Sequence, residues 1–296
     1  SIIFTGASSN SLKMGSNTNI GTLSVQKTGG SSLTLLSSLI VNARLDLISG
    51  DLNNSTNVLS LANNSTIYRT AGSITAIPTF SAGVNVQYLN TSDITMGFEI
   101  PSSSSVLKTL TIDCGTNSVI LPNNVTVNTN LTLTSGIVDT KTNSAILIMA
   151  DNSTVSPGVP GIGSATSFVV GYMRKVGNDQ FTFPLGDIKE DSIVVWAPIG
   201  ISAPSVVTDA FDARYFYSNI KDDLGILPYS DGTNMGPGLH HVSYLEYWML
   251  DRTAGTSSPS VTIHWKDETR HAISNLSDLT IAHWNASAMP NPRWEN

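Results

Sequence analysis

The most regular feature of the chain is a short segment of alternating apolar and polar residues that recurs along its first half. Leu23-Ser24-Val25 and Leu131-Thr132-Leu133 are two such segments. Their leading apolar residues recur at spacings of 22, 22, 22, 21 and 21, at Leu23, Leu45, Ile67, Leu89, Leu110 and Leu131. Alternation indicates strands with one buried face, and the Gly, Asn and Ser pairs between the segments indicate tight turns.

A longer repeat lies over this short one. The stretch from Gly21 to Thr66 matches the stretch from Lys108 to Thr154, with only single-residue insertions and deletions. Ser49-Gly50 lies over Ser135-Gly136, and Asn64 lies over Asn152, so the offset stays between 86 and 88 residues. A period held this closely is typical of repeat architectures.

A spacing near 22 residues with short strands suits one coil of a parallel β-solenoid, in which inward residues stack on their equivalents about 4.8 Å away. We therefore predict an all-β chain that begins with a solenoid over residues 1–166. Its two tandem repeats would cover roughly 1–82 and 83–166. The alternative is a pair of related antiparallel sandwiches, one for each repeat. The solenoid requires the six leading apolar residues to line up along a common axis.

The composition changes near residue 167. Every Trp and every His lies beyond this point, after a stretch at 156–163 that is rich in Pro and Gly and is typical of a linker. Short candidate strands follow at uneven spacing, among them 168–176, 192–197, 213–217 and 260–265. Six or seven strands with long loops predict a β-sandwich domain over residues 167–296.

Charge and cysteine content exclude several classes of partner and an internal disulfide. Only 12% of the residues are charged while 40% are hydrophobic, so the expected surface is neutral and rich in hydroxyl and amide groups. The net charge of -7 argues against nucleic acid and against an anionic membrane surface as partners. The single Cys114 excludes an internal disulfide, and no apolar run is long enough for membrane insertion.

Several segments beyond residue 167 carry a resemblance to a known group of proteins. The most specific is GYMRKVGNDQFTFPLGD at 171–187, followed by 196–200, 246–252, 261–265 and 279–284. Together they resemble a module of large secreted Bacteroidetes proteins, where it follows solenoid-like repeats with the Leu-Thr-Leu-Thr-Ser-Gly signature seen here at 131–136. The resemblance implies type IX secretion and an extracellular or cell-surface location, as an adhesin or surface-layer component. The sorting domain of that group is absent from these residues.

One further motif resembles a modification signal of the same group. Asp191-Ser192-Ile193 matches the Asp-Ser/Thr-aliphatic acceptor of Bacteroidetes O-glycosylation, which makes Ser192 a candidate glycosylation site. A match of three residues also arises by chance, so an unmodified serine is the competing interpretation.

Aromatic residues in the last third could bind carbohydrate. Trp248 and Tyr247 could stack on sugar rings, while Asp251 and Arg252 could bond hydroxyl groups. Trp265 and Trp284 share a strand face with aliphatic residues, which favours core packing for both. For Trp248 the pattern leaves core packing and sugar binding open.

Acidic residues in a long loop are the candidate metal ligands. Asp222, Asp223 and Asp231 could supply oxygen ligands to Ca²⁺, but their spacing is not that of an EF-hand, and a solvated loop is the favoured interpretation. We otherwise expect no cofactor.

The sequence carries no recognised catalytic motif, and charge on the coils is too sparse for the clustered Asp and Lys or Arg of solenoid polysaccharide lyases. Asp139 with Lys141 is a same-face pair on a strand, but it fits an exposed ion pair equally well.

We therefore expect a protein that is not an enzyme. Its expected role is structural or adhesive, outside a bacterial cell, as a segment of a large surface protein that could assemble into a filament or surface layer. Partners would be other copies of itself, other surface proteins or a polysaccharide. The alternative is a carbohydrate-binding module of a secreted polysaccharide-active protein.

Overall fold

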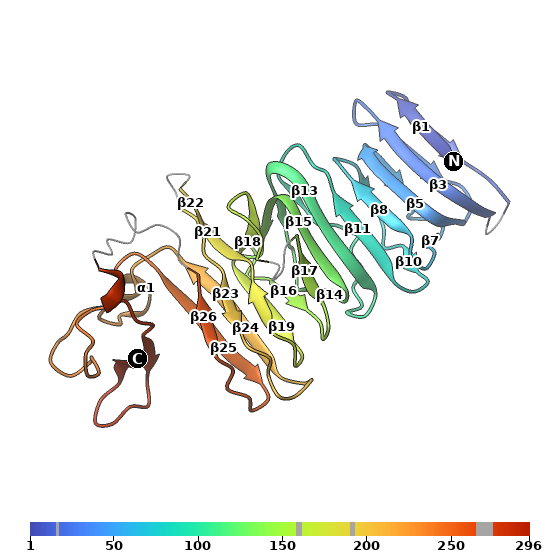
Figure 1. Cartoon of the computed structure of the whole chain (residues 1–296). Helices are drawn as coiled ribbons and strands as arrows, with labels where there is room; N and C mark the ends of the chain where they lie inside the picture. Colours follow the sequence, from blue (N-terminus) through green and yellow to red (C-terminus); the bar gives the residue numbers. More distant parts are fainter. Residues whose placement is uncertain (16–17, 158–161, 190–192, 265–274) are drawn as a thin grey trace.

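The computed structural model is an elongated stack of strands that runs the length of the molecule (Figure 1). It describes residues 1–15, 18–157, 162–189, 193–264 and 275–296. Strands make up 50% of the chain and helices 3%, and a parallel β-solenoid of about 8 turns is present, as predicted. Among the described residues, none of the helices has the length and apolar character needed to cross a membrane.

One long sheet forms a continuous wall of the stack. Its strands are, in order of pairing, β1 (Ile2–Gly6), β3 (Thr18–Lys27), β5 (Leu39–Ser49), β8 (Thr66–Arg69), β11 (Val84–Tyr88), β13 (Leu107–Ile120), β15 (Asn130–Asp139), β18 (Ser167–Val170), β21 (Leu185–Ile188) and β22 (Val194–Trp196). Short strands β7 (Leu59–Leu61), β10 (Thr79–Phe80), β12 (Ile94–Thr95) and β17 (Thr154–Ser156) pair beside this path. Neighbours on the path are parallel up to β21, because each coil returns the chain to the same wall one strand spacing further on.

Two smaller sheets form other walls. The first holds β2 (Asn10–Leu12), β4 (Ser32–Leu35), β6 (Asp51–Asn53) and β9 (Ser73–Ile74). The second holds β14 (Val125–Val127), β16 (Ile146–Met149), β19 (Tyr172–Val176), β24 (Ala210–Phe216) and β25 (Tyr247–Ala254). Alternate side chains of these strands point into the coil, so Leu33, Leu52, Leu147 and Met173 are buried in the same core as the long sheet.

The predicted ladder of aliphatic residues is confirmed at five of its six positions. Strand pairing places in one row Ile2, Leu23, Leu45, Ile67, Val86, Leu110, Leu131 and Val155. The prediction for Leu89 is wrong, because Val86 occupies that place between Ile67 and Leu110. The register shifts between Val84 and Asn85, and Leu89 follows the end of β11. The interval from Ile67 to Val86 is shorter than the repeat and the interval from Val86 to Leu110 is longer. An expectation of even spacing could not reveal these two compensating changes.

A second inward row is interrupted by polar side chains. Val25 and Leu47 are followed by Arg69 and Tyr88 before Ile112 and Leu133 restore the aliphatic row. Glu99 has no exposed surface, and its Oε1 lies 2.5 Å from Arg69 Nη1.

Further hydrogen bonds to Glu99 Oε1 and from Arg69 hold this buried polar cluster, while Glu99 Oε2 is buried without a partner. The Tyr88 hydroxyl donates to Glu99 Oε1 at 2.6 Å, and the Gly97 N–H donates to the same oxygen at 2.8 Å. Arg69 also donates from Nε to the Gly72 carbonyl and from Nη1 to the Thr95 carbonyl. Burial, and then the negative charge of Glu99, raise the pKa of Tyr88. The cluster therefore ties the segment 95–99 to the inside of the coil.

The two long repeats adopt the same turns at equivalent places. Asn64 and Asn152 both have left-handed backbones, with φ of 64° and 59°. Gly50 and Gly136 also match, with φ of 71° and 98°. A Cβ at Gly136 would lie 2.2 Å from Cys114 Sγ, so this corner needs glycine for both its backbone and its space. The repeat in the sequence is thus a repeat of coil geometry.

A separate β-sandwich over residues 167–296 is not confirmed. Beyond residue 167, β18 and β21 continue the long sheet in parallel, and β19 extends the sheet of β14 and β16. Only afterwards do β22, β24 and β25 pair antiparallel. Phe183 and Tyr215 belong to the same buried cluster as Leu23. The alternating strands of this region therefore continue and close the walls of the solenoid. The number of strands in the sequence could not distinguish this arrangement from a separate sandwich.

The last part of the chain packs on the outer face of β24 and β25. It includes α1 (Ile220–Leu224), the 3-10 helix η1 (Leu276–Asp278), β27 (His283–Asn285) and β28 (Arg293–Glu295). Its own small core contains Ile220 and Trp294, together with Tyr247 from β25 and Phe216 from β24. Trp284 packs against this core, as its alternation predicted, whereas Trp265 lies outside the described residues.

Candidate binding site

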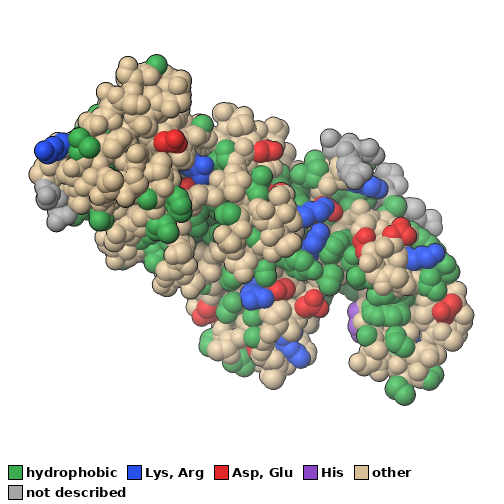
Figure 2. Space-filling model, turned by 180° about the vertical axis from the view of Figure 1, so that it is seen from behind, with side chains coloured by type: hydrophobic (Ala, Val, Ile, Leu, Met, Phe, Trp, Pro, Cys, Tyr) green, Lys and Arg blue, Asp and Glu red, His purple; other side chains and the backbone are tan. Residues whose placement is uncertain are grey.

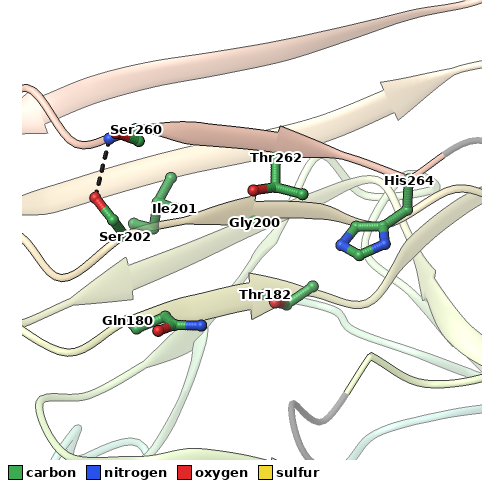
Figure 3. A pocket seen from close by; sticks show the side chains of 8 residues that line it. All are labelled: Gln180, Thr182, Gly200, Ile201, Ser202, Ser260, Thr262 and His264. Carbon is green, nitrogen blue, oxygen red and sulfur yellow. Dashed lines mark hydrogen bonds between the residues drawn. The ribbon is translucent and has the colours of Figure 1, made fainter.

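A polar trough lies across a third small sheet made of β20 (Phe181–Phe183), β23 (Ile199–Ile201) and β26 (Val261–Ile263). Antiparallel pairing places Thr182, Gly200 and Thr262 in one row across the three strands. The trough has a volume of about 250 Å³ and is lined by Gln180, Thr182, Gly200, Ile201, Ser202, Ser260, Thr262 and His264. Figure 3 shows these side chains along the sheet, with His264 at one end and the two serines at the other.

Strand alternation explains why polar groups gather there. Phe181, Phe183 and Ile199 are buried in the core on the other face of the same sheet, which leaves Thr182 and Gly200 facing the trough. A Cβ at Gly200 would lie 3.3 Å from Thr182 Oγ1 and 3.6 Å from the Thr262 Cβ. The missing side chain of Gly200 therefore provides the hollow between the two threonines.

The chemistry of the trough is neutral. Six of its eight described lining residues offer hydroxyl, amide or imidazole groups, and none of the eight is Asp, Glu, Lys or Arg. The Ser260 N–H donates to Ser202 Oγ at 2.9 Å, which fixes one end (Figure 3). Such groups can exchange hydrogen bonds with a hydroxyl-rich ligand without the desolvation of a full charge.

The predicted aromatic pair on β25 does not form a platform. Tyr247 and Trp248 are adjacent on a strand and point to opposite faces. Trp248 packs against Tyr215, with ring centroids 5.2 Å apart, and its Nε1 donates to the Ala197 carbonyl at 2.9 Å. Trp248 therefore has a packing role, between β25 and the loop before β23.

Tyr247 faces the C-terminal segment. Its ring stacks on Phe216 at 4.6 Å, and its hydroxyl donates to Asp223 Oδ2 at 2.9 Å. Burial, followed by this hydrogen bond to Asp223, raises the pKa of Tyr247. A side chain that is only 8% exposed offers little ring surface to a sugar.

The other two predicted sugar ligands lie near the exposed end of β25. Asp251 is paired in register with Asp212, and Arg252 with Phe211. Arg252 Nη1 donates to the carbonyls of Thr256 and Ser257, at 3.1 and 2.6 Å. Arg252 thus closes the turn after β25, and the four predicted residues are not brought into one site.

The candidate metal ligands are engaged in local structure. Asp222 and Asp223 lie in the first turn of α1, where Asp223 Oδ2 accepts hydrogen bonds from Ser218 and Tyr247. Asp231 Oδ1 accepts from the backbone and side chain of Thr233, and the backbone bond contributes most to lowering the Asp231 pKa. Across the described ranges, no three His, Cys, Asp or Glu side chains gather in a way that could hold a metal ion.

The candidate pair Asp139 and Lys141 is not brought together either. Lys141 Nζ pairs with Asp187 Oδ1 at 2.9 Å, whereas Asp139 accepts from the backbone and hydroxyl of Thr142. The predicted Asp139–Lys141 ion pair is therefore wrong. Ser192 lies outside the described residues.

Sequence reasoning missed the trough, although a signal was present. Thr182, Gly200 and Thr262 each stand between two apolar residues in a three-residue strand. That alternation predicts one polar face per strand, but the pairing that puts the three faces side by side is visible only in the fold.

Comparisons with known proteins return no match to a family model, a curated protein or a solved structure.

Proposed function

We propose that this chain is a non-catalytic structural or adhesive segment of a larger extracellular surface protein of a bacterium. The observation that carries this proposal is the unbroken parallel pairing from β1 to β21, which hydrogen-bonds each coil to the next. A stack of this kind acts as a stiff spacer, because bending it requires the breaking of several backbone bonds at once.

The outer surface supports a role in association. On the side shown in Figure 2, the half of the molecule that contains the coils is mostly neutral, with few basic or acidic side chains. Such a surface lacks the charge repulsion that keeps sheet proteins apart, so lateral packing of copies into a filament or layer is the expected mode of assembly.

Electron microscopy and sedimentation test this role directly. We expect the purified chain to be an elongated particle that resists proteolysis in the coils and forms fibres or sheets as its concentration rises. A matched variant carries Thr→Lys at the outward positions Thr34, Thr111 and Thr126 and should remain folded but monomeric. A compact particle, or an unassembled chain at high concentration, would count against the spacer and the assembly role respectively.

Carbohydrate binding is the second candidate function, and the neutral trough is the observation that favours it. Polysaccharide pull-down with Gly200→Val, which fills the hollow, tests the site. Binding should fall at least tenfold, while Thr126→Val on an outward coil position should leave it unchanged. Equal retention of wild type and Gly200→Val on every polysaccharide that binds would remove the trough from consideration.

A further inference from the structure

Arg214 lies on the outer face of β24, between two aromatic rings. Its guanidinium carbon lies 4.2 Å from the ring centroid of Phe216 and 5.2 Å from that of Tyr172. Met249 is its partner in register on β25. The two rings hold the guanidinium by cation–π contact and restrict where its N–H groups can point.

The N–H groups of Arg214 have no partner in the described structure. Its Nε is buried and makes no hydrogen bond, and the guanidinium takes part in none of the described ion pairs. The other arginines in the described ranges all have partners: Arg44, Arg69, Arg174, Arg252 and Arg293. Arg174, one strand away, pairs with Asp212 through both Nε and Nη2 at 2.5 and 2.8 Å.

The nearby carboxylates do not fill this gap. Asp212 is engaged by Arg174, and Asp223 by Ser218 and Tyr247. Asp251 is exposed and stands opposite Asp212 rather than opposite Arg214. A buried donor without a partner is rare in folded proteins and costs stability, so an acceptor from outside the chain would stabilise this one.

We propose that Arg214 binds the carboxylate of an acidic ligand, such as a small organic acid or a uronic acid unit of a saccharide. The planar fork of a guanidinium matches the two oxygens of a carboxylate, and a lysine in its place would offer only a point charge. Phe216 and Tyr172 fix the plane of the fork in advance, which lowers the entropy lost on binding. The site is on the outer face of β24 and β25, beside the C-terminal segment, and does not use the trough.

The carboxylate of the ligand can approach Arg214 from the solvent. Arg214 is half-buried, and Phe216 and Met249 beside it pack against the small core of the C-terminal segment. That segment forms one side of the site, and the Tyr172 ring on β19 lies on the guanidinium as well. The net charge of -7 opposes long polyanions, so short acidic ligands with millimolar affinity are expected.

Nuclear magnetic resonance of the arginine Nε–H groups tests the proposal on the intact chain. Digalacturonate, acetate and the neutral disaccharide lactose are the probes. The Arg214 signal, assigned by its loss in Arg214→Lys, should shift saturably with digalacturonate, and the Arg174 and Arg252 signals should not. Acetate acting as strongly as digalacturonate identifies a small acid as the ligand, and a larger effect of digalacturonate identifies a uronate saccharide.

Variants provide the second readout. Arg214→Lys keeps the charge and should weaken digalacturonate binding about tenfold, while Arg252→Lys, which alters an exposed arginine, should leave it unchanged. An unmoved Arg214 signal with both acids would overturn the proposal, as would an equal response to lactose. If Arg214→Lys fails to fold, contacts between the Nε–H and the rings of Phe216 and Tyr172 assign the wild-type signal instead, so the titration still decides.

Discussion

The coils before residue 157 and the antiparallel end after residue 193 share two sheets and a core, but they differ in the side chains that their strands carry. In the coils, one row of eight aliphatic residues repeats with little variation, and the side shown in Figure 2 carries few charged side chains. At the antiparallel end, the strands carry a trough lined mainly by polar residues, an arginine whose buried Nε has no partner, and stacked aromatic rings. The difference indicates that repetition provides length and stiffness, while departure from repetition provides sites that can recognise a ligand.

The first prediction compares the two long repeats and has the largest expected effect. Leu23→Ala and Leu110→Ala each remove a fully buried side chain from the same row, so each should lower the free energy of unfolding by about 2–5 kcal/mol. Their equivalent positions imply costs within about 1 kcal/mol of each other. Urea unfolding followed by circular dichroism measures both.

Leu36→Ala is the control for these variants. Leu36 is 50% exposed, so its truncation should change stability by less than about 0.5 kcal/mol. If Leu23→Ala behaved like Leu36→Ala while Leu110→Ala did not, the two repeats would not be equivalent coils.

The second prediction concerns the polar interruption of the coils. Glu99→Gln leaves Arg69 buried without its counter-charge and should cost about 3 kcal/mol. Glu295→Gln breaks the partly exposed pair with Arg293 in the C-terminal segment and should cost less than about 1 kcal/mol. Equal losses in thermal or urea unfolding would mean that the Arg69 cluster is open to water.

The third prediction uses the thiol under the Gly136 corner. Burial, and then the charge of Asp113, raise the pKa of Cys114 from 9.0 to about 11. At pH 8 the native chain should therefore contain on the order of a hundredfold less thiolate than the unfolded chain, and alkylation should slow accordingly. The raised pKa also favours the folded state below pH 9, an advantage that is lost as the pH rises toward 11.

Mass spectrometry of iodoacetamide-treated protein measures this rate in buffer and in urea. The unfolded chain is its own control, since the same thiol is then exposed. Similar alkylation rates in the two states would show that the corner between β13 and β15 opens readily.

Part of this architecture was predictable from sequence. Alternation and a period near 22 residues were sufficient for the parallel coils, and Asn64 and Asn152 were correctly paired as equivalent turns. The place of Val86 was not predictable, because a bulge in pairing leaves no trace in the spacing of apolar residues. The continuation of the solenoid sheets past residue 167 was not predictable for a related reason. The antiparallel strands that end the solenoid have the same alternation of apolar and polar residues as the strands of a sandwich.

Candidate sites were harder to predict than coils. Tyr247 and Trp248, the aromatic residues predicted to stack on sugars, pack against Phe216 and Tyr215 instead. Arg69 and Lys175 stand at inward positions where an aliphatic residue is expected, and burial lowers the pKa of Lys175. Their acceptance in the core depends on the partners Glu99 and Asp179, which only the folded chain brings close.

Distances between spin labels test the parallel stack most directly. In a Cys114→Ala background, labels at Thr22→Cys and Asn130→Cys occupy one outward row, five strand spacings apart. Electron resonance should give about 24 Å for this pair, and about 29 Å when the second label moves to Thr154→Cys on the next strand. Two distances that do not differ by about one strand spacing would contradict the stack and the stiff spacer built on it.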